Sequence, residues 1–474
     1  MRLSACGRGA GAESWLLHGA FEQAFAVAGE SFFAAVLSNI DREADEIGVD
    51  AIHSGAESAK EHGRREYKPE SNKARDPLDS LQCTDAMKTC ITAARLLTPT
   101  EVVENALVIV EDGTIQSVGS RAERPVPEGC QHLDFPDLVI APGYIDIHVH
   151  GGAGHDVMQD DPSGRVAFEK SLARCGVTSY LPTTVTASMD RILGALDRLA
   201  NIISAEKVDP TQVGARPLGI HLEGPFISPA KCGVHPPEYL IAPTPELFNR
   251  VWEASGGTLK MMTLAPELPG ASAVIREALK RGVFTSMGHS NATYEDAVRG
   301  IESGAVSATH TFNAMRELDH RDPGILGAVL SDDGVMADII ADGVHVAPPV
   351  VKFFLKAKGL ENAILITDAI SATGMGDGIY RLGPFQVEVR GERAEFEGKL
   401  AGSILTLDRA VRNVMDFADW TLQQSVILAT RNPARLIGVE SKGVIAVGND
   451  ADLIFLSPQG SVVHTMVGGR MFKN

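Results

Sequence analysis

The chain has 474 residues, more than one ordinary domain contains and close to the length of a large α/β barrel with a smaller companion. Hydrophobic residues make up 44% and charged residues 22%, as in soluble globular proteins. The formal net charge of -18 argues against nucleic acid as a partner, because a phosphate backbone needs a basic surface. No apolar run approaches a membrane span, and the six cysteines lack paired spacing, so we expect reduced thiols in the cytoplasm.

Residues 1–86 differ in composition from the rest of the chain. Apolar residues recur at helical spacing over 21–47, and residues 54–80 are dense in charged residues, serine and proline and can bury little. We therefore expect an N-terminal extension that is partly disordered, with Met87 as the functional start.

Short apolar runs separated by turn residues follow Met87 and return at the end of the chain. Residues 106–115 form such a run around an Asp-Gly pair, which is typical of a β-hairpin. We predict that residues 87–140 and 441–474 join into one small β-sandwich domain.

The central residues 141–440 alternate apolar strand candidates with helical patterns. The strand candidates are 144–149, 179–182, 217–222, 259–264, 283–287, 305–308, 335–340 and 363–366. Such alternation favours parallel strands joined by right-handed crossovers. Eight units predict a (β/α)8 barrel of the TIM type, with chemistry at the C-terminal ends of the strands.

Ionisable residues recur where these predicted strands end. His148 and His150 lie two residues apart, so a strand would place both on one face, where they can bind one metal ion. Glu223 closes a later strand before a Gly-Pro turn and is a candidate metal ligand or acid/base. Each feature has a plainer explanation, namely two interior or surface histidines and a salt-bridged glutamate.

Three further strand ends carry His289, His310 and Asp368. Alone, each histidine would be a structural residue, and the aspartate would cap the following turn. In series after Glu223, they predict a catalytic metal site, because zinc accepts imidazole nitrogen and carboxylate oxygen and leaves one position for water. A carboxylate beside such a water can move its proton.

The motifs resemble those of the amidohydrolase superfamily and, within it, the N-acetylglucosamine-6-phosphate deacetylases. The likeness runs from Met87 to the C-terminus. The matching stretches are residues 142–146, 221–226, 288–290, 309–315, 342–345, 367–369, 400–403 and 432–434.

The resemblance implies a role for each site residue. Glu223, His289 and His310 would hold the principal metal, and Asp368 would be the catalytic acid/base. The residues that would bind substrate are His235 near the acetyl carbonyl, Arg321 and His345 at the phosphate with help from the backbone of Asn313 and Ala314, and Leu400, Ala401 and Gly402 on the sugar or acetyl side.

The number and identity of the metal ions stay open at this point. Members with Gln and Asn in place of the first two histidines use one ion, whereas this chain keeps His148 and His150, which predicts a possible second ion. We expect zinc, with iron, manganese and cobalt as alternatives.

The expected reaction is hydrolysis of the acetamide of N-acetylglucosamine 6-phosphate by a metal-activated water with Asp368 as acid/base, in amino-sugar catabolism. The resemblance also implies a homodimer, in which Arg321 could reach the neighbouring pocket. The alternatives are another amidohydrolase (a deacetylase for the galactosamine isomer, a deaminase or a dihydroorotase-like enzyme) and a non-catalytic scaffold. Many two-metal members use a carboxylated lysine, whose place Glu223 would fill here, which favours the deacetylase.

Overall fold

The computed structural model describes residues 88–206 and 214–472. The predictions for residues 1–86, including a helix over 21–47, lie outside the described residues.

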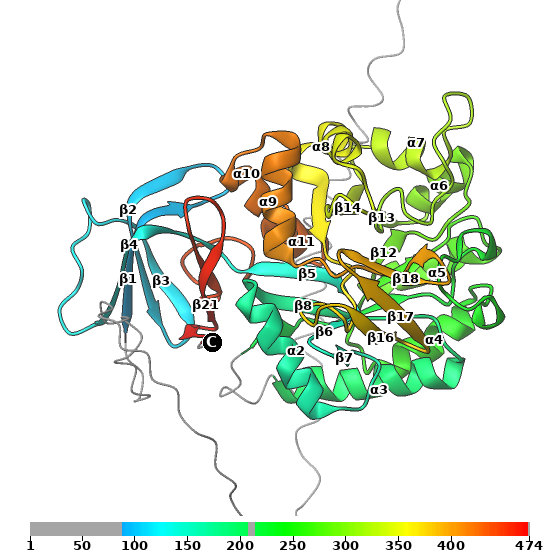
Figure 1. Cartoon of the computed structure of the whole chain (residues 1–474), viewed down its shortest axis with the longest axis horizontal. Helices are drawn as coiled ribbons and strands as arrows, with labels where there is room; N and C mark the ends of the chain where they lie inside the picture. Colours follow the sequence, from blue (N-terminus) through cyan, green and yellow to red (C-terminus); the bar gives the residue numbers. More distant parts are fainter. Residues whose placement is uncertain (1–87, 207–213, 473–474) are drawn as a thin grey trace, which may run out of the picture. The chain divides into compact units, whose positions relative to one another are not determined.

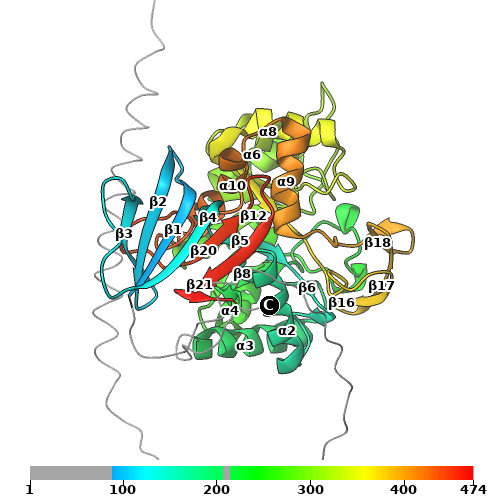
Figure 2. The ribbon, with the colours of Figure 1, turned by 60° about the vertical axis from the view of Figure 1, so that its left-hand side comes forward.

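Strands from both flanks of the chain form one seven-stranded sheet in the order β22-β21-β20-β4-β1-β2-β3 (Figure 2). The strands are β1 (Thr89–Leu97), β2 (Val102–Glu111), β3 (Thr114–Ser120), β4 (Gln131–Pro142), β20 (Leu453–Leu456), β21 (Val462–Val467) and β22 (Arg470–Met471). Asp112 and Gly113 both have positive φ, which suits the tight β2–β3 turn. The two flanks meet where β20 pairs antiparallel with β4, so both flanks contribute to a separate sheet domain, which the described residues form as one seven-stranded sheet where a β-sandwich was predicted.

The central part of the chain forms a parallel barrel (Figure 1). Its strands are β5 (Tyr144–Val149), β8 (Val177–Thr184), β10 (Ile220–Glu223), β11 (Leu259–Leu264), β12 (Phe284–Met287), β13 (Ala305–Ala308), β14 (Met336–Ile340) and β15 (Ala363–Ile366), and the short β9 (Arg216–Pro217) pairs with β8. Past the end of β15, Ala369 bridges to Val149 and brings the last strand back to the first. The predicted eight-stranded (β/α)8 barrel is therefore confirmed.

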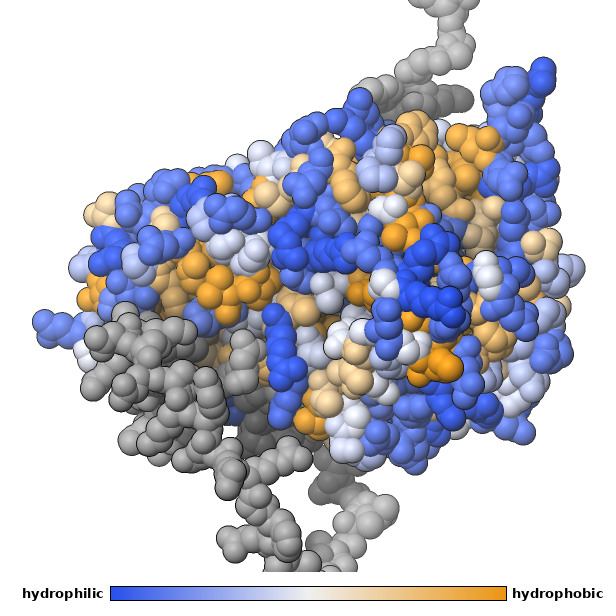
Figure 3. All heavy atoms as spheres, in the orientation of Figure 1, coloured by the Kyte–Doolittle hydropathy of each residue, from blue (hydrophilic) through white to orange (hydrophobic). Residues whose placement is uncertain are grey.

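Helices surround the barrel (Figure 1). They are α2 (Pro162–Arg174), α3 (Met189–Glu206), α4 (Pro245–Ala254), α5 (Ala271–Lys280), α6 (Tyr294–Glu302), α7 (Gly324–Ser331), α8 (Pro348–Asn362), α9 (Leu407–Ala418), α10 (Leu422–Ile427) and α11 (Arg431–Leu436). Side-chain caps begin several of them, as at Thr293, where a capping box with Asp296 satisfies the first amides of α6. None of the described helices is long and apolar enough to cross a membrane. On the face drawn in Figure 3, hydrophilic residues are mixed with smaller apolar areas.

A four-stranded antiparallel sheet follows β15 and was not predicted. Its strands are β16 (Gly378–Leu382), β17 (Phe385–Arg390), β18 (Arg393–Phe396) and β19 (Lys399–Leu400). Along β17, buried and exposed residues alternate, so the period-2 pattern was present in the sequence. A small apolar core that includes Leu382, Val387 and Ala401 supports this sheet. A two-stranded ribbon of β6 (Gly151–Gly152) and β7 (His155–Asp156) follows β5, and Asp156 accepts a hydrogen bond from the amide of Gly383 at 2.6 Å.

Candidate metal centre and active site

The first ligand group combines the end of β5 with the residue after β15. His148 and His150 are 0% and 4% exposed, and their Nε2 atoms lie 3.2 Å apart. Oδ1 of Asp368 lies 3.4 Å from Nε2 of His148 and 3.1 Å from Nε2 of His150. The two histidines share a face because β-strand side chains alternate, as predicted.

The second ligand group comes from β10 and the ends of β12 and β13. Oε1 of Glu223 lies 3.3 Å from Nε2 of His289 and 3.1 Å from Nε2 of His310. The two histidine nitrogens are 3.1 Å apart. All three side chains are buried, so a metal ion held here would be shielded from bulk water.

Glu223 joins the two groups. Its second oxygen, Oε2, lies 3.4 Å from Nε2 of His148 and 3.2 Å from Nε2 of His150. Nitrogen and oxygen ligands about 2.1 Å from a tetrahedral zinc ion lie about 3.4 Å from one another. The separations in both groups therefore fit metal ligands, with one carboxylate between two adjoining sites.

The outer ring nitrogens support the same interpretation. Nδ1 of His150 donates to the main-chain oxygen of Thr183 at 2.9 Å. Nδ1 of His289 donates to the main-chain oxygen of Lys231, also at 2.9 Å. Nδ1 of His310 donates to the main-chain oxygen of Asn313 at 3.2 Å. A proton held on Nδ1 leaves the lone pair of Nε2 directed at the centre, which is the usual arrangement around metal-binding histidines.

The carboxylates of the centre are ionised. Burial opposes ionisation of Asp368, but the neighbouring His148 and His150 lower its pKa to about 2. Burial likewise opposes ionisation of Glu223, and His148 and the other histidines hold its pKa well below the usual range. Two buried carboxylates beside four imidazole rings form a donor set suited to a divalent cation.

His235 has the opposite ring polarity. The main-chain amide of Thr186 donates to its Nδ1 at 3.2 Å, and the hydroxyl of Thr186 lies 2.7 Å from the same nitrogen. The proton therefore sits on Nε2, which lies 3.7 Å from Oε2 of Glu223. Burial, together with the nearby His289, lowers the pKa of His235 to about 3, so the ring is a neutral hydrogen-bond donor at neutral pH.

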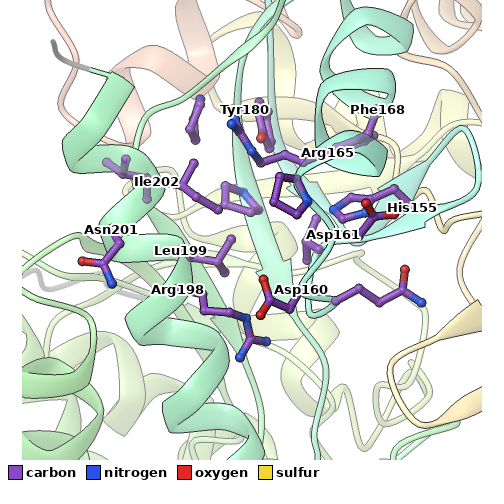
Figure 4. Close-up of a pocket in the computed structure, with 16 residues that line it drawn as sticks. His155, Asp160, Asp161, Arg165, Phe168, Tyr180, Arg198, Leu199, Asn201 and Ile202 are labelled. Carbon is purple, nitrogen blue, oxygen red and sulfur yellow. The ribbon is translucent and has the colours of Figure 1, made fainter. Parts of the chain in front are cut away.

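Both ligand groups open onto one cavity of about 330 Å³. A second cavity of about 280 Å³ lies elsewhere, among residues of β7, β8, α2 and α3 that include His155, Arg165 and Arg198 (Figure 4). Of the described residues, none predicted for the site lines this second cavity. The chemistry is thus concentrated in the cavity above the ligand groups.

Comparison with known proteins agrees with this geometry. The family model described as "Amidohydrolase family" matches residues 139–472. The chain belongs to the amidohydrolase family. This span includes every barrel strand and both ligand groups.

Relatives of this amidohydrolase carry deacetylase names. The chain is 37% identical over 379 residues to the N-acetylglucosamine-6-phosphate deacetylase of Bacillus subtilis, covering 79% of this chain and 95% of the relative. It is 36% identical to the N-acetylgalactosamine-6-phosphate deacetylase of Escherichia coli O157:H7, covering 80% and 98%. A mutant N-acetyl-D-glucosamine-6-phosphate deacetylase of Mycobacterium smegmatis, solved with N-acetyl-D-glucosamine-6-phosphate, is similar with a TM-score of 0.76, 33% identity and coverage of 82% and 100%.

The cavity of this amidohydrolase brings together most of the residues predicted to bind substrate. Those that line it are His235, Asn313, Ala314, His345, Leu400 and Gly402. Ala401 is fully buried and belongs to the core of the β16–β19 sheet instead. Arg321 is exposed on the loop after His320 and does not line the cavity of its own chain.

Sequence reasoning missed several residues of the cavity wall. Lys231 and Val234 precede His235 in the segment after β10, where the prediction named the histidine alone. Leu382 and Lys399 come from the unpredicted β16–β19 sheet. The strand alternation over residues 378–400 could have predicted these strands, but only the structure places them next to the site.

Proposed function

We propose that this amidohydrolase removes the acetyl group from N-acetylglucosamine 6-phosphate and releases glucosamine 6-phosphate and acetate. One observation carries the proposal: two metal-ligand groups that share Glu223 open onto the same cavity as Asp368 and the neutral donor His235. The names of the relatives support the substrate. Because one relative is an N-acetylgalactosamine-6-phosphate deacetylase, N-acetylgalactosamine 6-phosphate is a second candidate substrate.

We assign the principal metal to Glu223, His289 and His310, and a second ion to His148, His150 and Asp368. Zinc suits these nitrogen and oxygen donors at their tetrahedral separations, and metal analysis will distinguish it from iron, manganese and cobalt. When bound, a divalent ion supplies Lewis acidity, which lowers the pKa of water and polarises a carbonyl.

Asp368 moves the proton in the proposed reaction. Its ionised carboxylate accepts a proton from the water whose oxygen bonds to the acetyl carbon. The same carboxyl group then gives this proton to the amide nitrogen as the C–N bond breaks. The second water proton leaves the new carboxyl group and is taken up by the amine, so the products at neutral pH are acetate and the ammonium form of glucosamine 6-phosphate, and atoms and charge balance.

His235 stabilises the oxygen of the acetyl group. Its Nε2–H is fixed by Thr186 at Nδ1, and it faces the cavity beside Glu223. A neutral donor held in place costs no reorganisation as negative charge develops on the carbonyl oxygen. Leu400, Gly402 and the backbone at Ala401 would pack against the sugar or acetyl side.

The phosphate would lie at His345, away from the reacting amide. The carboxylate of Asp342 accepts the Nδ1–H of His345 at 2.7 Å and fixes the orientation of the ring in the cavity wall. The backbone of Asn313 and Ala314 lies in the same wall. Because Arg321 is exposed outside its own cavity, we propose that it binds the phosphate in the partner subunit of a homodimer.

The test is acetate release measured on purified protein with known metal content. We expect rapid release from N-acetylglucosamine 6-phosphate and much slower release from unphosphorylated N-acetylglucosamine. N-acetylgalactosamine 6-phosphate in the same assay decides between the two isomers. Failure to deacetylate any amino-sugar phosphate with metal bound would refute the proposal.

The free thiols of Cys90, Cys130, Cys175 and Cys232 support a cytoplasmic location, which we also propose.

A further inference from the structure

His148 differs from the other three histidines of the ligand groups at its outer nitrogen. Those three each donate Nδ1–H to a main-chain oxygen. Within the described part of the chain, Nδ1 of His148 is buried and has no hydrogen-bond partner. If Nε2 of His148 binds a metal ion, the proton must sit on Nδ1, and a buried N–H without an acceptor is unfavourable.

Asp338, on β14, has a buried carboxylate oxygen that lacks a hydrogen-bond donor. Its side chain is fully buried, and its Oδ1 accepts the main-chain N–H of His310. Its Oδ2 has no partner among the described residues. The rings of His148 and His310 lie 5.6 Å apart, so His148 lies beside the residue whose main chain Asp338 contacts. Burial raises the pKa of Asp338, and His148 is the neighbour that most opposes the rise, which is consistent with this proximity.

We propose that Asp338 is the positioning residue for His148. Because the described residues form no direct bond between these two atoms, Oδ2 accepts Nδ1–H of His148 through one bridging water or after a small movement of the two side chains, while Oδ1 holds the main chain of His310. One buried carboxylate thereby orients a ligand from each group. The inference rests on the proposed function, because it takes His148 as a metal ligand.

The consequence concerns the second metal ion. With its proton held on Nδ1, His148 keeps the lone pair of Nε2 for the ion shared with His150 and Asp368. Loss of the acceptor frees the ring to rotate or to move its proton to Nε2. Removal of such an outer partner lowers metal affinity by about ten- to hundredfold. Asp338 thus determines whether this chain holds two ions or one.

The test uses Asp338→Asn and a matched control, Ser307→Ala. In the asparagine variant, the amide oxygen can still accept the His310 amide, but the NH2 group cannot accept Nδ1–H. Ser307 is a buried residue on β13 whose hydroxyl has no partner among the described residues, so its removal controls for a lost polar group in the core. Metal-free full-length proteins are titrated with Co²⁺, and bound metal and visible absorption are measured.

We expect wild-type protein and Ser307→Ala to bind two Co²⁺ per chain. Asp338→Asn should bind the first with little change and the second about ten- to hundredfold more weakly. A variant that binds the second ion as tightly as wild type overturns the inference. So does wild-type protein that saturates at one ion, although a one-ion deacetylase would survive that result. Absence of both metal binding and deacetylation would refute the proposed function itself.

A second measurement applies if Asp338→Asn does not fold, as judged by circular dichroism. In zinc-loaded wild-type protein labelled with ¹⁵N-histidine, the Nδ1–H of His148 is assigned by its loss in His148→Gln. We expect a downfield proton that exchanges slowly with solvent, as a buried hydrogen bond to a carboxylate requires. A His148 ring protonated at Nε2 instead would overturn the inference.

Discussion

The chemistry of each histidine in this site depends on the neighbour of one ring nitrogen. Main-chain oxygens fix the proton on Nδ1 of His150, His289 and His310, which leaves Nε2 to bind a cation. Thr186 does the reverse at His235, because it donates to Nδ1 and leaves Nε2–H as a donor. Similar side chains a few ångströms apart thereby acquire opposite functions, metal binding and oxyanion stabilisation.

Asp368→Asn tests the proton-transfer role at this scale. The amide keeps the size of the side chain but cannot accept a proton, so kcat should fall by roughly 10²- to 10⁴-fold. Glu223, His289 and His310 are unchanged, so the principal metal should stay bound. Steady-state acetate release and metal analysis check both points, with the exposed Asp377→Asn as control. Near-normal turnover by Asp368→Asn would remove the residue from this role.

Thr186→Val tests the fixed ring of His235. Valine keeps the main-chain amide but loses the hydroxyl 2.7 Å from Nδ1, so the ring is held less firmly. We expect kcat to fall about tenfold, the equivalent of one hydrogen bond, with a smaller change in KM. Thr186→Ser keeps the hydroxyl and should remain close to wild type. Equal kinetics for the valine and serine variants would show that the hydroxyl has no such role.

At the scale of elements, three ligands have the same backbone conformation at the same place after a strand. His289, His310 and Asp368 each lie two residues beyond the end of β12, β13 and β15, and each has positive φ, of 45°, 34° and 51°. This conformation is uncommon for residues other than glycine, and it costs on the order of 1–3 kcal/mol at each position. The repeated turn brings the side chains over the barrel mouth, and the packed strands below maintain it.

The contact that closes the barrel between β5 and β15 depends on a buried hydrogen bond between Thr367 and Asp146. Oγ1 of Thr367 donates to Oδ2 of Asp146 at 2.6 Å, and Oδ1 of Asp146 lies 3.3 Å from the main-chain amide of His148. Asp146 therefore joins the strands that carry the first ligand group. Burial raises the pKa of Asp146 to about 6, although its hydrogen bond with Thr367 opposes the rise.

Thr367→Val should weaken this contact. The valine leaves Oδ2 of Asp146 buried without its donor, which costs about 1–3 kcal/mol of unfolding free energy. Because His148 and Asp368 lie on the two strands, kcat should fall as well. Denaturant unfolding and acetate release measure the two effects, and Thr367→Ser, which keeps the hydroxyl, should show neither. Unchanged stability in the valine variant would contradict the assigned role of the pair.

At the scale of the whole molecule, the centre collects ligands from strands spread around the barrel. β5, β10, β12, β13 and β15 each contribute, and Glu223 and Asp368 place two negative charges in a buried space. Without a cation, these charges repel each other, so metal binding and barrel stability are coupled.

Removal of the metal should therefore destabilise the folded chain. A ligand at a hundred times its Kd stabilises the native state by about 2.7 kcal/mol, so chelation should lower Tm by several degrees. Added zinc should restore both Tm and acetate release. Thermal unfolding of holo, chelated and reconstituted protein checks this expectation. A Tm that is the same in metal-free and zinc-loaded protein would contradict it.

Part of this structure could be predicted because its information is local. Apolar runs ended by a histidine or carboxylate marked the barrel strands and the ligand residues, since side chains of parallel strands project at one rim. The β16–β19 sheet was missed although its alternation is visible, because residues 378–400 were assigned to the barrel. Lys399 and Leu382 were missed with it.

The sequence by itself determined the strand order, the barrel and the residue types at each strand end, because a period of two and a hydrophobic pattern act over a few residues. Only the tertiary structure decided that the two oxygens of Glu223 face different groups, that Thr186 fixes the ring of His235, and that Arg321 lies outside its own cavity. These features depend on contacts between residues far apart in the chain, and the packing of the folded barrel alone sets their distances.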